Sequence, residues 1–368
     1  MVYILNDPHL YGGDSFGIIG LIDNYKSLII NDQYYGQGYV ELKAPATPDN
    51  IQLLWPGRYI VREKDRDGSI YKRVMAIQDI NITTDADEGN IIIATGVSLK
   101  SEILRRRIVN QRTFVSGNAK TCLGSVIRDN CINASDSNRN ISNLYMEWGF
   151  DSTSSTMDTQ LLGENIAEWM ESITQTYGWG WDMYINSIEY RLKVYQGENR
   201  TTDQYENMPI VFSREYDNLY NSDYNRFTSN YTNVAYIFGE DTPDGLSRKN
   251  TIYNTDSSYN KGLRRYERFV DSSMTTAEGE TTISDSQYYK NLRALAKQEM
   301  DAVKLYEFGA TTAPDGIFVI NKDYFLGDLV NIETEYGLKA KARIIEIIYS
   351  EDENGETVVP GFSEWEVA

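Results

Sequence analysis

Closely spaced carboxylates are the residues of this chain most able to do chemistry. Polysaccharide hydrolysis uses two such groups, one as acid and one as nucleophile or base. Close spacing is found in four pairs: Glu164/Glu168, Glu168/Glu171, Asp182/Glu189 and Asp203/Glu206. The chain has 54 acidic residues, so close pairs are expected by chance. The first two pairs also fit the solvent face of a helix, and we assign no catalytic residue to them.

Three other motifs each have a chemical and a structural interpretation. Residues 65–69 (Asp-Arg-Asp-Gly-Ser) resemble the start of a calcium loop, but the later ligands are missing, and a hairpin turn explains them better. Arg105-Arg106-Arg107, followed by Arg112, could contact nucleic acid or an acidic neighbour, although a solvated helix face is the simpler interpretation. Gly178-Trp179-Gly180-Trp181 could stack on sugars, but packing against strands explains this motif better.

A single histidine, His9, leaves few groups for acid–base catalysis at neutral pH. The sequence contains no phosphate-binding glycine loop, zinc-ligand spacing or nucleophile elbow. We therefore predict no catalytic, cofactor-binding or metal-binding residues, and no enzymatic activity.

The net charge and the two cysteines further limit the classes of protein to which this chain can belong. The formal charge of −19 argues against DNA binding, which normally needs a basic surface. Cys122 and Cys131 would point to opposite faces of one helix, which predicts free buried thiols and folding in a reducing cytoplasm. No apolar run is long enough to span a membrane, and the N-terminus lacks an export-signal pattern.

The elements that must position these residues follow a β, α, β order. Residues 1–96 contain short strand-like runs separated by turn signals. Residues 97–180 are helix-rich, with an amphipathic pattern from Val97 to Ile108 and a helical stripe from Leu162 to Tyr177 that stops at Gly178. Residues 181–368 return to strands, with an exposed insertion at about 240–285 and a helix at about 286–306. Asn354-Gly355 predicts a hairpin. The predicted fold class is α+β: two antiparallel β-barrel or sandwich domains with helical segments inserted.

The order of segments resembles the tail-hub, or baseplate-hub, proteins of long-tailed phages. The resemblance spans nearly the whole chain and is carried by the following stretches: Gly38–Pro45, Leu54–Ile60, Ile77–Ile80, Ile93–Leu99 with Ile103–Arg107, Phe212–Leu219, Thr232–Gly239, and Tyr324–Val330 with Ala342–Ile347. No single motif is specific, since Gly327-Asp328 before a strand is common in small barrels. Their order and spacing give the resemblance its weight.

The resemblance implies two tail-tube-like β domains per chain, arranged in a homotrimeric ring at the tail tip of the virion. It implies contacts with a distal tail protein, a tape-measure protein and tip or fibre proteins, with DNA only in transit through an acidic lumen. The protein would be made in the host cytoplasm. Many relatives carry a C-terminal hydrolase or receptor-binding module, and whether one follows Ala368 stays open. The alternatives are a carbohydrate-binding or cell-wall-degrading tail protein and a monomeric adhesin-like β protein.

Overall fold

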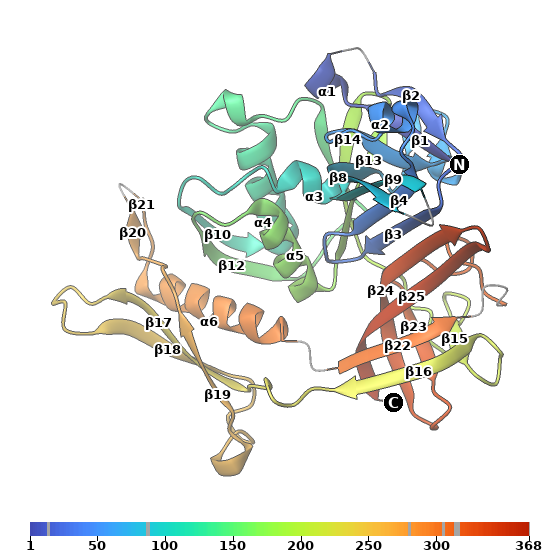
Figure 1. Ribbon diagram of the computed structural model, residues 1–368. Coiled ribbons are helices and arrows are strands. Elements are labelled where there is room, and N and C mark those ends of the chain that lie inside the picture. Colours follow the sequence, from blue (N-terminus) through green and yellow to red (C-terminus); the bar gives the residue numbers. More distant parts are fainter. Residues whose placement is uncertain (13–14, 86–88, 279–280, 304–305, 313–316, 368) are drawn as a thin grey trace.

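The computed structural model describes residues 1–12, 15–85, 89–278, 281–303, 306–312 and 317–367 (Figure 1). The chain is mostly β, with large sheets and a cluster of helices in the middle of the sequence. The described helices are α1 (Pro8–Tyr11), α2 (Pro48–Leu53), α3 (Leu99–Leu104), α4 (Ala119–Ile127), α5 (Ile166–Tyr177) and α6 (Asp285–Asp301).

One large sheet contains strands from both ends of the chain. Its order in the described residues is β16 (Leu219–Arg226), β22 (Tyr306–Thr312), β25 (Gly355–Val367), β24 (Lys339–Asp352), β3 (Ser27–Gln33), β4 (Tyr39–Pro45), β9 (Gly89–Ser98), β8 (Met75–Asp85), β5 (Tyr59–Arg62), β1 (Val2–Asn6) and β2 (Gly17–Ile22). β23 (Leu329–Glu333) pairs with β24, and β15 (Val211–Ser213) pairs with β23.

Smaller sheets flank the large one. They consist of β11 (Leu144–Trp148), β14 (Glu189–Tyr195), β13 (Gly180–Asn186), β7 (Ile70–Tyr71) and β6 (Arg66–Asp67); of β10 (Thr113–Asn118) and β12 (Thr156–Leu161); of β18 (Arg248–Asn254), β17 (Val234–Asp241) and β19 (Glu267–Asp271); and of β20 (Ala277–Glu278) and β21 (Thr281–Thr282).

The N-terminal and C-terminal strands join edge to edge at β3 and β24. These strands run antiparallel, from Ser27 opposite Asp352 to Gln33 opposite Glu346. The Glu346 carboxylate accepts hydrogen bonds from Asn31 at 2.6 Å and Gln33 at 2.7 Å, so side chains reinforce the backbone ladder. Residues more than 300 positions apart in the sequence thus lie in one sheet.

Strand β5 is buried on both faces because it separates two hydrophobic cores. Tyr59 and Val61 point into a core shared with α3, α4, α5 and the β13–β14 hairpin. Ile60 points into a second core, made with the C-terminal strands. Successive side chains of β5 therefore point into different cores, and neither face of the strand meets solvent.

The helices differ from prediction at their ends. The helix expected over Val97–Ile108 is only α3, because β9 continues to Ser98, and the amphipathic pattern does not hold there, since Lys100 and Glu102 are both buried. α5 begins after the Asn165 cap and stops at Gly178 in the left-handed conformation, as predicted.

The other local predictions can be compared in the same way. α6 ends at Asp301, and β22 begins at Tyr306, within the range expected to be helical. The hairpin at Asn354-Gly355 is confirmed, with Asp352 opposite Gly355. Within the range expected to form an exposed insertion, β18 and β19 pair with β17. The sheet they form packs against α6 through Ala235, Ile237, Val270, Tyr288, Leu292 and Ala296.

Candidate functional site

Tyr34, directly after β3, lies where three parts of the chain meet. Its side chain is fully buried, and its amide donates to the Ile345 carbonyl of β24 at 2.8 Å. Its hydroxyl donates to the Gly178 carbonyl at 3.1 Å and accepts from the Gly197 amide at 3.0 Å. One residue thus contacts the C-terminal strands, the end of α5 and the segment after β14.

Glycines make room for the Tyr34 ring. A Cβ atom at Gly180 would lie 2.1 Å from the ring, and one at Gly327 would lie 2.2 Å from it. Gly327 also has a φ of +99°, which favours glycine. Gly197 packs against the Gly327 backbone, where a Cβ would lie 1.9 Å from the carbonyl oxygen. Two motifs singled out in the sequence, 178–181 and 327–328, therefore meet on one tyrosine.

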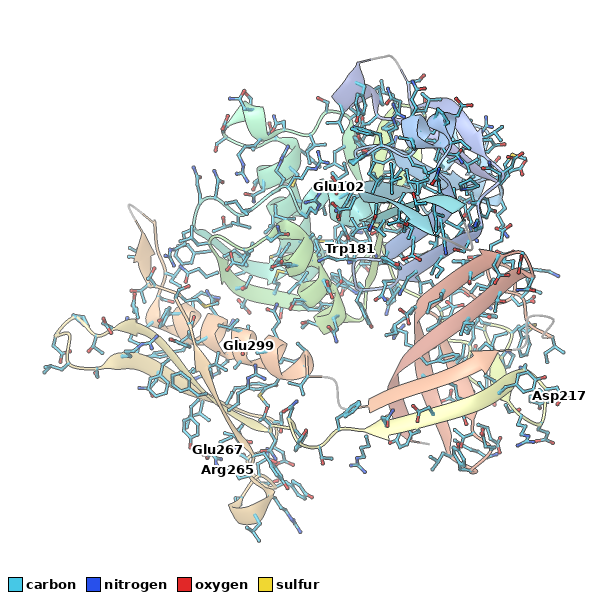
Figure 2. The ribbon with its side chains drawn as sticks, in the orientation of Figure 1. Glu102, Trp181, Asp217, Arg265, Glu267 and Glu299 are labelled. Atoms are coloured by element: carbon cyan, nitrogen blue, oxygen red, sulfur yellow. The ribbon has the colours of Figure 1, made fainter. Side chains whose placement is uncertain are left out.

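Lys100 and Trp181 hold the backbone on either side of Tyr34. Lys100 is buried and donates from Nζ to the carbonyls of Gln33 at 2.6 Å and Trp181 at 2.8 Å. Burial lowers the pKa of Lys100, against the pull of nearby carboxylates. The Trp181 indole donates to the Tyr35 carbonyl at 2.5 Å, and Figure 2 shows Trp181 deep within the body of the protein. The interpretation of the tryptophans as packing residues fits these contacts.

Asp328 fixes the segment that carries Gly327. Its buried carboxylate accepts from the Glu198 amide at 2.8 Å, the Phe325 amide at 2.9 Å and Arg200 Nε at 2.7 Å. Burial raises the pKa of Asp328, although these donors act in the opposite direction. The carboxylate therefore serves as an acceptor that shapes the loop before β23.

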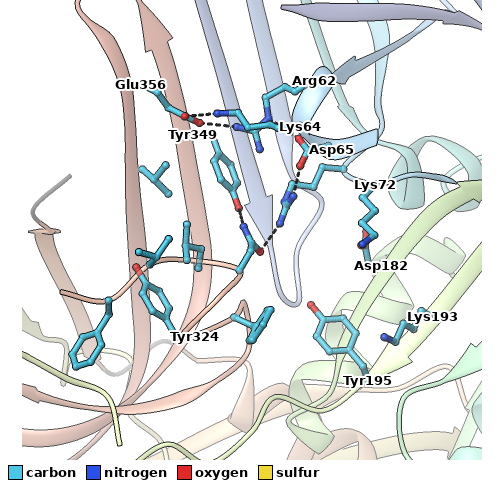
Figure 3. Close-up of a pocket in the computed structure, with 17 residues that line it drawn as sticks. Arg62, Lys64, Asp65, Lys72, Asp182, Lys193, Tyr195, Tyr324, Tyr349 and Glu356 are labelled. Atoms are coloured by element: carbon cyan, nitrogen blue, oxygen red, sulfur yellow. Dashed lines mark hydrogen bonds and ion pairs between the residues drawn. The ribbon is translucent and has the colours of Figure 1, made fainter. Parts of the chain in front are cut away.

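A second cluster is centred on Tyr349 of β24 (Figure 3). Arg62 stacks on the Tyr349 ring at 4.0 Å, and Arg73 lies 5.2 Å from its centroid. Asp65 pairs with both arginines, at 2.6 Å from Arg62 Nε. Asn321 accepts from Arg73 at 2.5 Å and donates to the Tyr349 hydroxyl at 3.1 Å. This cluster ties the N-terminal strands to β24 and to the segment before β23.

A cleft of about 690 Å³ opens next to this cluster and continues into a hollow of about 360 Å³. Lys72, Lys193, Asp182 and Tyr195 line both parts (Figure 3). Burial, followed by the charge of Asp32, raises the pKa of Asp182 to about 6, while Lys100 acts to lower it. The cleft therefore contains a carboxyl group whose charge changes near pH 6.

The close carboxylate pairs lie in different surroundings. Asp182 lines the cleft, whereas Glu189 forms an ion pair with Arg191 on the neighbouring strand β14. Asp203 pairs with Lys341 at 2.5 Å. Glu168 and Glu171 do lie near each other, and the charge of Glu168 contributes to the raised pKa of Glu171, after burial. Neither of these two glutamates lines the cleft described above.

The remaining motifs have structural roles in the described residues. Residues 65–69 contain the β6–β7 hairpin, as predicted, with Asp67 opposite Ile70. Arg105 and Arg106 both pair with the buried Glu102. The His9 ring lies 5.3 Å from that of Tyr190. Cys122 and Cys131 are buried and free, as predicted.

Sequence reasoning missed Tyr34, Lys100 and Arg73. Tyr34 follows a strand like many other tyrosines, and only its distant glycine neighbours make it special. Lys100 and Arg73 look like surface cations, since nothing local in the sequence shows that their partners come from β3 and β13. Within the part of the chain that the structure describes, no helix is both long and apolar enough to cross a membrane.

The fold matches solved structures of phage-tail proteins. A 43 kDa tail protein of prophage MuSo2 from Shewanella oneidensis aligns with a TM-score of 0.58 and 11% identity, covering 99% of this chain and 98% of that one. A tail protein from Neisseria meningitidis MC58 aligns with a TM-score of 0.54 and 11% identity, and the alignment covers 99% of this chain and 96% of that one. Prophage tail protein gp18 from Listeria monocytogenes EGD-e aligns with a TM-score of 0.50 and 13% identity, and the alignment covers 98% of this chain and 94% of that one.

The chain has, then, a phage-tail protein fold. It belongs to the siphovirus ReqiPepy6 Gp37-like protein family, whose model matches residues 2–362. No curated protein matches the sequence significantly. The prediction of a phage tail-protein family is confirmed, and the family and the matching structures are phage structural tail proteins.

Replacing Gly180 by alanine tests the packing around Tyr34. The new methyl group would collide with a buried ring whose hydroxyl is hydrogen-bonded, so we expect a loss of about 1–3 kcal/mol in the free energy of unfolding. Gly124→Ala is the matched control, since its methyl would meet only Trp148 at 3.6 Å within α4 and should stabilise by about 0.5–1 kcal/mol. Chemical denaturation measures both, and equal effects would contradict the account.

Asp182→Asn tests the raised pKa in the cleft. A carboxyl group whose pKa is higher in the folded than in the unfolded state costs stability as pH rises from about 4 to about 6. The amide removes this cost, so the variant should melt at a higher temperature than the wild type at pH 7.5 and at nearly the same temperature at pH 4. Asp203→Asn, which removes an exposed carboxylate whose pKa is lowered by Lys341 and Thr201, should give no gain at pH 7.5. A gain that is independent of pH would contradict the prediction.

Proposed function

We propose that this protein is the structural hub at the distal end of a phage tail. Three copies form a ring that joins the tail tube to the tip or baseplate, and DNA passes through its lumen. The neighbours are a distal tail protein, a tape-measure protein and tip or fibre proteins, and the protein is located in the virion. No catalysis is involved.

The edge-to-edge joining of β3 and β24 is the observation that carries this proposal. It links a set of antiparallel strands from residues 1–96 to a second set from residues 211–367. If each set is one tail-tube-like unit, a trimer presents six units, which matches a sixfold tube above to a threefold tip below. The helix-rich residues 97–180 form a third part, which shares a hydrophobic core with β5 of the N-terminal set.

A hub must also hold its two units at a fixed angle, because its ring has to fit the tube. The Tyr34 contacts and the Tyr349 cluster supply such restraints, since each ties N-terminal strands to β24 and its neighbours. The charge of −19 fits a lumen through which DNA moves without sticking.

The oligomeric state tests the proposal. Mass photometry of the purified chain over a range of concentrations should show a species of three times 42.1 kDa, and negative-stain images of it should show a threefold ring. A compact monomer at every concentration contradicts the proposal. So does clearing of peptidoglycan by the chain that is lost in Glu168→Gln, which would favour the alternative of a cell-wall-degrading protein.

A further inference from the structure

Residues 234–301 form a unit with a hydrophobic core of its own, and we call this unit the arm. Its strands β17, β18 and β19 form a separate sheet, and α6 packs on one face of it. All the buried side chains of this core come from residues 235–296. In Figure 1 the arm lies at the lower left, with α6 on the side of the helix-rich part. The arm thus buries its apolar side chains against one another.

Helix α6 has a second face, which is rich in amides. Gln287, Asn291 and Gln298 are separated by four and seven positions, so they lie along one side of the helix. Leu292 and Ala296, which pack on the sheet of the arm, lie on a different side. Asn291 is only 1% exposed, so the amide face is covered as well.

The amide face of α6 meets the helix-rich part of the chain through hydrogen bonds. Gln287 donates from Nε2 to the Asp158 carboxylate of β12 at 2.7 Å and to Asn291 Oδ1 at 2.9 Å. Gln298 donates to the Ser172 hydroxyl of α5 at 2.6 Å. Because water replaces such bonds when the groups separate, their net contribution to holding the arm is modest.

The segment after β19 adds two more polar contacts. The Thr275 amide donates to Gln160 Oε1 of β12 at 2.9 Å, and Arg112 donates to the Ser273 carbonyl at 3.1 Å. Gln160 is 4% exposed, and its Nε2 atom has no acceptor among the described residues. A buried donor without a partner costs free energy, which is recovered when the amide meets water. Gln160 therefore favours separation of the arm from β12.

We propose that the arm is a separable part of the chain, which leaves β12 and α5 as one body while its own core stays folded. Polar contacts between parts of one chain resemble transient protein–protein interfaces, for which relative motion is the normal expectation. Opening of a unit in this way requires less free energy than unfolding of the whole chain. The inference goes beyond the proposed ring and does not depend on it, because the motion takes place within one chain.

Thiol labelling at two positions of α6 tests this inference. Asn291→Cys places a thiol on the amide face, and Ala296→Cys places one in the core of the arm. Both positions are 1% exposed or less, so each thiol reacts only after an opening event. Without denaturant, an aromatic disulfide reagent should label Asn291→Cys about tenfold faster or more than Ala296→Cys. Peptide mass spectrometry separates these labels from those on the buried native Cys122 and Cys131.

Equal labelling rates in the two variants would overturn the proposal, since the amide face would then open only when the arm itself unfolds. Labelling of neither thiol below the denaturant concentration at which the chain unfolds would overturn it as well.

Two adjacent residues of α6 supply a matched pair of second substitutions. Gln298→Ala removes the bond to Ser172 across the contact, so it should speed the labelling of Asn291→Cys about fivefold. The same substitution should leave the labelling of Ala296→Cys unchanged. Glu299→Ala removes the bond to Arg268 of β19, which lies inside the arm, and should not speed the labelling of Asn291→Cys. Equal acceleration by both substitutions would show a general loosening of α6 and would contradict the proposal.

Discussion

The burial of Tyr34 among backbone glycines is the constraint on which the rest of the structure depends. Its ring fills the space that Gly180 and Gly327 leave open. Its hydroxyl donates a hydrogen bond to the Gly178 carbonyl and accepts one from the Gly197 amide. These glycines come from three separate segments, so none of them can move without disturbing the others. Close packing of this kind tolerates little change in volume.

The Tyr349 cluster complements this constraint from the other side of the β3–β24 pairing. Arg62 and Arg73 surround an aromatic ring of β24, and the buried Asp65 forms ion pairs with both of them. An exposed ion pair would contribute little, but buried and hydrogen-bonded pairs are costly to break by removing one partner. Together with Tyr34, the cluster fixes the angle between the two halves of the large sheet.

The sequence predicted those features that depend on local patterns. The stop of α5 at Gly178, the hairpin before Gly355 and the free buried thiols follow from short-range rules, and the structure agrees with them. The order of segments was enough to recognise the tail-protein family.

The features that depend on distant partners could not be predicted in this way. Lys100 has the sequence context of a surface residue, yet it is buried because carbonyl groups of Gln33 and Trp181 satisfy its ammonium group. The same holds for Glu102, whose arginine partners are local but whose burial depends on the surrounding strands. The pairing of β3 with β24 joins residues more than 300 positions apart, and no local pattern indicates it.

Hydrogen exchange in a Tyr34→Phe variant tests the central claim most directly. Three backbone amides report on the three segments. The Gly197 amide donates a hydrogen bond to the Tyr34 hydroxyl, and the Trp181 amide donates one to the Tyr34 carbonyl. The Gly327 amide donates a hydrogen bond to the Ile344 carbonyl. If Tyr34 holds the three segments together, loss of its hydroxyl should speed exchange at all three amides, while α4 exchanges as in the wild type. Faster exchange at Gly197 alone would show that the hydroxyl makes only a local bond and would contradict the account.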